Sequence, residues 1–141
     1  MSPQELAEAC AAKLYAEDTA SRSLGIGIDG VGPGRSVATM TVTERMLNGH
    51  TIGHGGYVFL LADTAFAFAC NTYDRVTVAA GADVTFLEPA RGGDELTATA
   101  VERTRRGRSG LYDVTVRRAD GTVLAEFRGR SRTLDAAILH P

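Results

Sequence analysis

The most apolar stretch of the chain carries one charge. It runs from His54 to Cys70 and reads His-Gly-Gly-Tyr-Val-Phe-Leu-Leu-Ala-Asp-Thr-Ala-Phe-Ala-Phe-Ala-Cys, in which Asp63 is the only acidic residue. A helix that is apolar on every face belongs in a protein core. Because burying an unpartnered carboxylate costs several kcal/mol, Asp63 is expected to be there for function. The stretch is shorter than the roughly 20 apolar residues of a membrane span. We predict a buried central helix, about residues 55–72.

Composition narrows the class of protein. With 141 residues and a formal net charge of -2, the chain is expected to be one domain, residues 1–141, without affinity for nucleic acid or a membrane. The first residues lack the basic and apolar regions of a signal peptide, which predicts a cytoplasmic location. Cys10 and Cys70 are then expected to be buried, unreactive thiols.

Local sequence patterns predict helices in some segments and strands in others. Ser2-Pro3-Gln4-Glu5 is a capping box with proline at the first helical position, which predicts an N-terminal helix over about residues 3–17. Alternating or β-rich patterns predict strands over residues 35–43, 76–86, 96–103, 111–117 and 122–133. One face of the 76–86 strand is apolar, as packing on a helix requires. Turns are expected at 105–110 and 119–121, and a tail over the last eight residues.

The order of these elements predicts an α+β fold, in which a curled antiparallel β-sheet wraps around a long central α-helix.

Two sequence patterns suggest cofactor or metal binding, and context argues against both. Gly25-x-Gly27-x-x-Gly30 spells a dinucleotide motif, but a predicted helix precedes it and Pro33 follows it, so loop and bulge glycines are expected instead. His50, His54 and Asp63 resemble a metal triad, but the histidines lie in a glycine-rich loop rather than on a helix. We expect no metal and no cofactor.

His54-Gly55-Gly56 predicts a helix start stripped of side chains. The free backbone N–H groups there, together with the helix dipole, can stabilise an oxyanion that forms on a carbonyl. The alternative is an ordinary flexible helix start, and the presence of Asp63 on the same helix favours the oxyanion site.

The spacing between these groups suggests a dimer. Asp63 lies about 12 Å along the helix axis from Gly55, at 1.5 Å per residue. A nucleophile and a carbonyl must approach to about 3–3.5 Å. Two antiparallel helices about a two-fold axis bring Asp63 of one chain near Gly55 of the other.

Arginines gather in two places, Arg103 to Arg108 at one predicted hairpin and Arg128, Arg130 and Arg132 on one face of the last strand. Guanidinium groups suit a phosphorylated small molecule. The alternative is that these are edge-strand and turn charges that deter aggregation.

Several motifs together resemble the hotdog-fold acyl-CoA thioesterases of the phenylacetate-degradation (PaaI) type. They are Leu47-Asn48-Gly49-His50, His54-Gly55-Gly56, Leu61-Ala62-Asp63-Thr64-Ala65-Phe66-Ala67, Val84-Thr85-Phe86-Leu87-Glu88-Pro89, Gly93-Asp94, Tyr112-Asp113-Val114 and Phe127-Arg128-Gly129. The resemblance covers nearly the whole chain. It implies a cytoplasmic enzyme that forms homodimers with shared active sites, assembled into tetramers. The implied reaction hydrolyses phenylacetyl-CoA, hydroxyphenylacetyl-CoA or a related short or aryl acyl-CoA to the acid and CoA.

The resemblance also implies roles for individual residues. Asp63 is the general base or nucleophile, Gly55 the oxyanion donor, and His54 and Asn48 polarise the site and place water. The expected substrate-binding residues are Gly56, Thr64, Arg106, Arg108, Arg128 and Arg130.

The chain departs from the family pattern on the strand after the central helix. Related enzymes often carry Ser or Thr there, whereas this chain has Ala79 and Ala80, with Thr77 nearby. Two other activities remain open from the sequence: a hotdog acyl-CoA dehydratase and a non-catalytic acyl-CoA-binding sensor.

Overall fold

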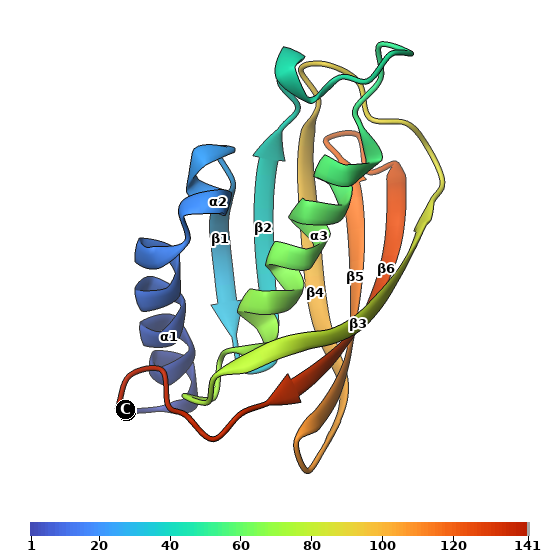
Figure 1. Ribbon diagram of the computed structural model, residues 1–141. Coiled ribbons are helices and arrows are strands. Elements are labelled where there is room, and N and C mark those ends of the chain that lie inside the picture. The colour runs from blue at the N-terminus through green and yellow to red at the C-terminus, as the bar shows by residue number, and fades with distance from the viewer. Residues whose placement is uncertain (141) are drawn as a thin grey trace.

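A six-stranded antiparallel sheet curves around one long helix in the computed structural model, which describes residues 1–140 (Figure 1). The strand order is β1-β2-β4-β5-β6-β3, and α3 packs across the sheet, most closely against β2, β4 and β5. The predicted α+β fold is confirmed. The elements are α1 (Pro3–Glu17), α2 (Thr19–Ser23), β1 (Gly27–Gly32), β2 (Arg35–Thr41), a 3₁₀ turn (Glu44–Met46), α3 (Gly55–Cys70), β3 (Thr77–Phe86), β4 (Glu95–Arg106), β5 (Ser109–Arg118) and β6 (Val123–Thr133).

Both hydrogen bonds of the N-terminal capping box are present. The Ser2 hydroxyl accepts from the Glu5 N–H at 3.1 Å, and the Glu5 carboxylate accepts from the Ser2 N–H at 3.0 Å. Two donors at the start of α1 are thereby satisfied.

No helix within residues 1–140 is long and apolar enough to cross a membrane.

Helix α3 supplies the centre of the core. Leu61, Ala62, Ala65 and Ala69 are fully buried, and the Phe66 ring packs against aromatic rings on β5 and β6. The helix begins at Gly55 and ends at Cys70, earlier than the expected residue 72. The Asn71 side chain ends it by donating to the carbonyls of Ala67 and Thr77 at 2.8 and 2.9 Å.

The strands of the meander extend further than their apolar patterns suggest. β4 and β5 continue to a tight connection at Gly107-Arg108, where Gly107 adopts the left-handed φ of 57° that favours glycine. The predicted turn at residues 119–121 is present, with Gly121 at φ 90° and the Thr122 N–H donating to Asp120.

Residues 25–32 were expected to form a loop, and this expectation is wrong. Residues Gly27–Gly32 form β1, which pairs with β2 and contains a bulge between Ile28 and Gly30. The bulge glycines were foreseen, but the pairing was not, because a glycine-rich segment has little strand propensity of its own.

The C-terminal segment was expected to be a free tail, and this is also wrong over the described residues 134–140; Pro141 lies outside them. Ile138 is buried, and the backbone N–H groups of Ile138 and Leu139 donate to the Asp74 carboxylate at 3.0 and 2.7 Å. His140 pairs with the same carboxylate at 2.8 Å. These hydrogen bonds lower the pKa of Asp74 and hold the segment beside α1.

The apolar face expected along residues 76–86 is interrupted. Ala82 and Val84 pack on the core, whereas Val78 and Phe86 remain 43% and 52% exposed. A bulge between Ala79 and Gly81 shifts the register with β6, so Val78 faces the opposite side of the sheet from Ala82 and Val84. Phe86 is on the same side as Val84 and is exposed at the end of the strand, over the start of α3.

Gly129 on β6 provides a test of the packing between sheet and helix. A Cβ at this position would lie 2.7 Å from the Phe66 ring, which has no room to move. We expect Gly129→Ala to lower the free energy of unfolding by about 1–3 kcal/mol, as overpacking of a core does. Urea titration at fixed protein concentration measures this.

Gly30→Ala is the matched control, because nothing lies within 4 Å of its added Cβ. We expect its stability to stay close to wild type. Equal stability of the two variants would contradict the tight packing of Phe66 on β6.

Candidate active site

A compact loop delivers the chain to the start of α3. The Asn48 carboxamide oxygen accepts from the His50 N–H at 2.9 Å, and the Asn48 N–H donates to the Ile52 carbonyl at 2.8 Å. Thr51 holds a left-handed φ of 64°. The His54 N–H donates to the Met46 carbonyl at 2.7 Å, which fixes the loop to the preceding 3₁₀ turn. The loop thus sets the direction from which α3 begins.

His54 is the N-cap of α3. Its Nδ1 accepts from the Gly56 N–H at 2.9 Å. In a neutral imidazole one ring nitrogen accepts and the other carries the proton. Nε2 is therefore the N–H of neutral His54, and it is free to donate because the ring is exposed.

The Gly55 N–H has no acceptor among residues 1–140. It belongs to the first turn of α3, where backbone donors lack intrahelical partners. Gly55 and Asn48 line a cavity of about 340 Å³ at this end of the helix, together with the apolar side chains of Val58, Phe86 and Leu87. An oxygen atom that enters this cavity meets an unused N–H and the positive end of the helix dipole.

Phe86 leaves little room for a side chain at Gly55. A Cβ there would lie 3.1 Å from the Phe86 ring, which packs across the helix start. Phe86 and Leu87 are residues that sequence reasoning did not place in the site. Their signal was available, since two large apolar residues stand at the end of a strand immediately before Glu88-Pro89.

Asp63 is half-buried and makes no hydrogen bond or ion pair within the described chain. Burial raises the pKa of its carboxyl group above the ordinary value of 3.8. A carboxylate without a partner, poorly hydrated and with a raised pKa, is suited to accept a proton.

One side of α3 is left uncovered by the sheet, and Asp63 lies on it. The residues of α3 that stay partly or fully exposed after its first turn include Leu60, Asp63 and Ala67, which recur at helical spacing in line with Gly56. The sequence predicted a helix buried on every face. In the single chain, the uncovered stripe is instead an exposed apolar surface with a carboxylate in its middle.

Two of the expected substrate-binding residues have other contacts. The Gly56 N–H is used by His54. Thr64 is 7% exposed, and its hydroxyl shares a 3.2 Å hydrogen bond with Ser21 on α2. Thr64 therefore takes part in packing, and we assign it no contact with substrate.

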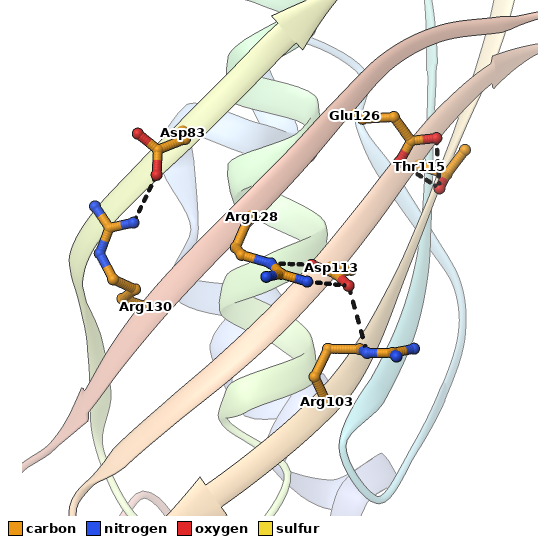
Figure 2. Close-up of polar contacts among 7 residues, drawn as sticks. All are labelled: Asp83, Arg103, Asp113, Thr115, Glu126, Arg128 and Arg130. Carbon is orange, nitrogen blue, oxygen red and sulfur yellow. Dashed lines mark hydrogen bonds and ion pairs between the residues drawn. The ribbon is translucent and has the colours of Figure 1, made fainter.

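Arg128 and Arg130 lie on the face of the sheet turned away from α3 (Figure 2). Arg128 makes a two-pronged ion pair with Asp113, at 2.7 and 2.9 Å, and lowers the pKa of that carboxyl group. Arg130 pairs with Asp83 at 2.7 Å. Both arginines are paired with aspartates and lie on the face of the sheet away from Gly55. Their position therefore does not support a role in substrate binding.

Arg106 and Arg108 flank the β4–β5 connection, at the end of α3 opposite Gly55 (Figure 1). Arg108 pairs with Asp135, while Arg106 is exposed and has no ion pair among residues 1–140. One chain therefore brings Asn48, His54 and Gly55 together, places Asp63 further along the helix, and leaves these arginines at the other end.

Comparison with known proteins links this geometry to a family. Residues 50–125 match the thioesterase superfamily. The chain is 43% identical over 125 residues to the acyl-coenzyme A thioesterase PaaI of Escherichia coli K12, covering 89% of each protein. It superposes on the structure of E. coli PaaI, from the phenylacetic acid degradation operon, with a TM-score of 0.95 and 41% identity, covering 96% of this chain and 99% of the other. A mutant of the phenylacetic acid degradation protein PaaI from Thermus thermophilus gives a TM-score of 0.80 at 32% identity, covering 83% and 100%.

The raised pKa of Asp63 predicts a specific dependence of stability on pH. The folded chain holds the Asp63 proton more tightly than the unfolded chain does. The protonated carboxyl group therefore stabilises the folded chain fully below the unfolded pKa of 3.8, and this stabilisation is lost as pH rises through the folded pKa. We expect Asp63→Asn to be more stable than wild type near neutral pH, with the difference shrinking toward acid pH. Urea titrations across this range measure it.

Asp113→Asn is the control with the opposite sign. Arg128 lowers the pKa of Asp113. The ionised Asp113 carboxylate therefore stabilises the folded chain above pH 3.8, and this stabilisation is lost as pH falls through the folded pKa. We expect this variant to be less stable than wild type at neutral pH. A constant difference between Asp63→Asn and wild type at every pH would contradict the shift at Asp63.

Proposed function

The chain belongs to the thioesterase superfamily, as an acyl-CoA thioesterase of the PaaI type with the hotdog fold, and we propose that it hydrolyses phenylacetyl-CoA, hydroxyphenylacetyl-CoA or a related short or aryl acyl-CoA. The products are the free acid and CoA. The observation that carries the mechanism is one helix that holds both an unpartnered carboxylate, Asp63, and an unused N–H, that of Gly55. Phe86 and Leu87 beside Gly55 give an apolar surface of the kind that an aryl group contacts.

The Gly55 N–H donates to the carbonyl oxygen of the thioester in this mechanism. Negative charge that grows on this oxygen is stabilised by the N–H and by the helix dipole, without reorganisation of the protein. The carbon–sulfur bond then breaks, and the sulfur leaves as a thiolate that takes up a proton to give free CoA.

Asp63 activates the group that attacks the carbonyl carbon. As a general base, its carboxylate takes a proton from water while the water oxygen bonds to carbon. As a nucleophile, its own oxygen bonds to carbon and forms a mixed anhydride, which water hydrolyses to the acid. Both routes consume one water and return Asp63 to the carboxylate form.

His54 and Asn48 assist at the same end of the helix. With Nδ1 engaged by Gly56, neutral His54 presents its Nε2–H to the carbonyl oxygen or the departing sulfur. The Asn48 carboxamide oxygen is occupied by the loop, which leaves its NH₂ group to bind water or substrate.

Each active site is shared between two chains of a homodimer. Gly55 and Asp63 are separated by about 12 Å along their own helix, too far to act on one carbonyl. An antiparallel α3 from a second copy, related by a two-fold axis, supplies the missing carboxylate. Association of such dimers into a tetramer belongs to the same proposal.

Two unpartnered surfaces support this dimer. The uncovered stripe of α3 is apolar around Asp63. β3 stands at the edge of the sheet and pairs only with β6, so the backbone groups on its other side are open to a second β3. The open edge carries Val78, Ala79 and Ala80, which are exposed here. Pairing of β3 edges about a two-fold axis also brings the two α3 helices together.

Arg106 and Arg108 contribute to binding the phosphates of CoA. Their end of the molecule is remote from Gly55 in one chain. In the antiparallel dimer, the partner's α3 runs the opposite way, which places this end of one chain toward the Gly55 end of the other.

Asp63→Asn tests the chemistry. Removing a positioned general base or nucleophile is expected to lower kcat about 100-fold or more, while KM for phenylacetyl-CoA changes little because the amide keeps the size of the carboxylate. Release of free thiol from phenylacetyl-CoA measures both constants. Asp29→Asn, an exposed site on the opposite edge strand, is the control and should behave as wild type. Near-wild-type turnover by Asp63→Asn would remove this residue from the mechanism.

A mixed dimer tests the shared site. Asp63→Ala lacks the carboxylate, and Gly55→Pro lacks the oxyanion N–H; neither homodimer should be active. A heterodimer of the two contains one complete site, so purified heterodimers should recover up to about half of the wild-type activity.

Gly55→Ala is the control for Gly55→Pro, since it keeps the N–H but meets the same Phe86 ring. Activity in Gly55→Ala shows that contact with Phe86 is not what inactivates the proline variant. Folded heterodimers without activity would show that Asp63 acts within its own chain.

A further inference from the structure

A second cavity lies at the C-terminal end of α3, away from the Gly55 cavity. It measures about 170 Å³ and is enclosed by the β4–β5 connection, the start of β3 and the end of β6. Its polar lining consists chiefly of two guanidinium groups, those of Arg75 and Arg105, and of six hydroxyl-bearing residues, Tyr73, Thr77, Ser109, Tyr112, Ser131 and Thr133. None of these residues has a role in the hydrolysis proposed above.

The charge around this cavity is positive. Arg75 makes no ion pair among residues 1–140, and no carboxylate is part of the lining. Glu102 contacts three side chains of the lining: its Oε1 accepts from the Tyr73 and Tyr112 hydroxyls at 3.0 and 2.9 Å and from Arg105 Nε at 3.1 Å. Burial raises the pKa of the Cys70 thiol, also in the lining, to about 12, so it carries no charge at neutral pH.

Arg105 is held in place while most of its donors stay free. Its guanidinium carbon lies 3.6 Å from the centre of the Tyr73 ring, a stacked cation–π contact. The ion pair with Glu102 uses Nε only. The terminal nitrogens remain available to an acceptor inside the cavity.

The Ser131 hydroxyl is accessible from the cavity. Its residue is 6% exposed, and its oxygen forms no hydrogen bond with any residue of the described chain. Gly110 makes room for it, because a Cβ on Gly110 would lie 2.5 Å from the Ser131 oxygen. A hydroxyl that is accessible from the cavity and not used by the protein can donate to a ligand held there.

We propose that this cavity binds a phosphate group. A phosphate carries up to two negative charges and several strong acceptor oxygens, which match the two guanidinium groups and the Ser131 hydroxyl of the lining. The volume corresponds to about five or six water molecules at roughly 30 Å³ each, enough for a tetrahedral oxyanion but not for a nucleoside. The phosphate is either free inorganic phosphate or the terminal phosphomonoester of CoA. Its binding does not depend on thioester hydrolysis.

Calorimetric titration with inorganic phosphate, at constant ionic strength, tests the site on the full chain. We expect saturable binding by wild type and a dissociation constant at least about tenfold higher in Arg75→Gln and in Ser131→Ala, since each removes a hydrogen bond to a charged ligand. Arg132→Gln is the matched control: Arg132 neighbours Ser131 on β6 but is exposed on the opposite face. It should bind phosphate within about twofold of wild type.

A second titration identifies the source of the phosphate by comparing CoA with dephospho-CoA, which lacks the terminal phosphomonoester. If the cavity takes that group, wild type prefers CoA, and Arg75→Gln and Ser131→Ala abolish the preference. If it takes free phosphate, any preference survives in the variants while inorganic phosphate binding is weakened. Absence of saturable phosphate binding in wild type, or equal binding by all variants in both titrations, would overturn the proposal.

Discussion

The incomplete covering of α3 governs both the fold and the site. Most of its side chains are apolar, and burial of apolar surface is the main force that closes the sheet around it. The sheet covers only one side, so the opposite stripe stays open, with Asp63 in its middle. A carboxylate there is removed from part of its hydration without gaining a partner, which is why its pKa rises. The same open stripe is what a second copy of the chain would cover.

Apolar contacts alone would not decide which face of α3 stays open, because they are non-directional. Buried polar contacts fix the rotation of the helix. The Ser36 hydroxyl on β2 donates to the Ala65 carbonyl at 2.6 Å, and the Thr64 hydroxyl shares a hydrogen bond with Ser21 on α2. Asp63 precedes Thr64 and Ala65, and the attachment of these two residues to α2 and β2 leaves its carboxylate on the uncovered stripe.

The sequence predicted those parts of the fold whose signals are local. The capping box at Ser2 and Glu5, the glycines before α3 and the turn at Gly121 each act within a few residues. β1 and the docked C-terminal segment were missed because long-range pairing creates them. The glycines of β1 become a strand only through β2, and Asp74 holds residues more than sixty positions away.

The sequence also singled out Asp63 and the Gly55 helix start as candidate site residues, since a lone charge and a bare helix N-terminus are visible without coordinates. The sequence could not distinguish paired arginines from cavity-lining ones. Carboxylates on neighbouring strands neutralise Arg128 and Arg130, while Arg75 and Arg105 line a cavity assembled from segments distant in the sequence. The two ends of α3 therefore differ: a free N–H lies at its N-terminus, and a basic cavity lies at its C-terminal end. A single chain holds these ends a helix length apart, roughly 24 Å at 1.5 Å per residue. In the proposed antiparallel dimer, the basic end of one chain would lie toward the Gly55 end of the other, and one extended thioester would contact both.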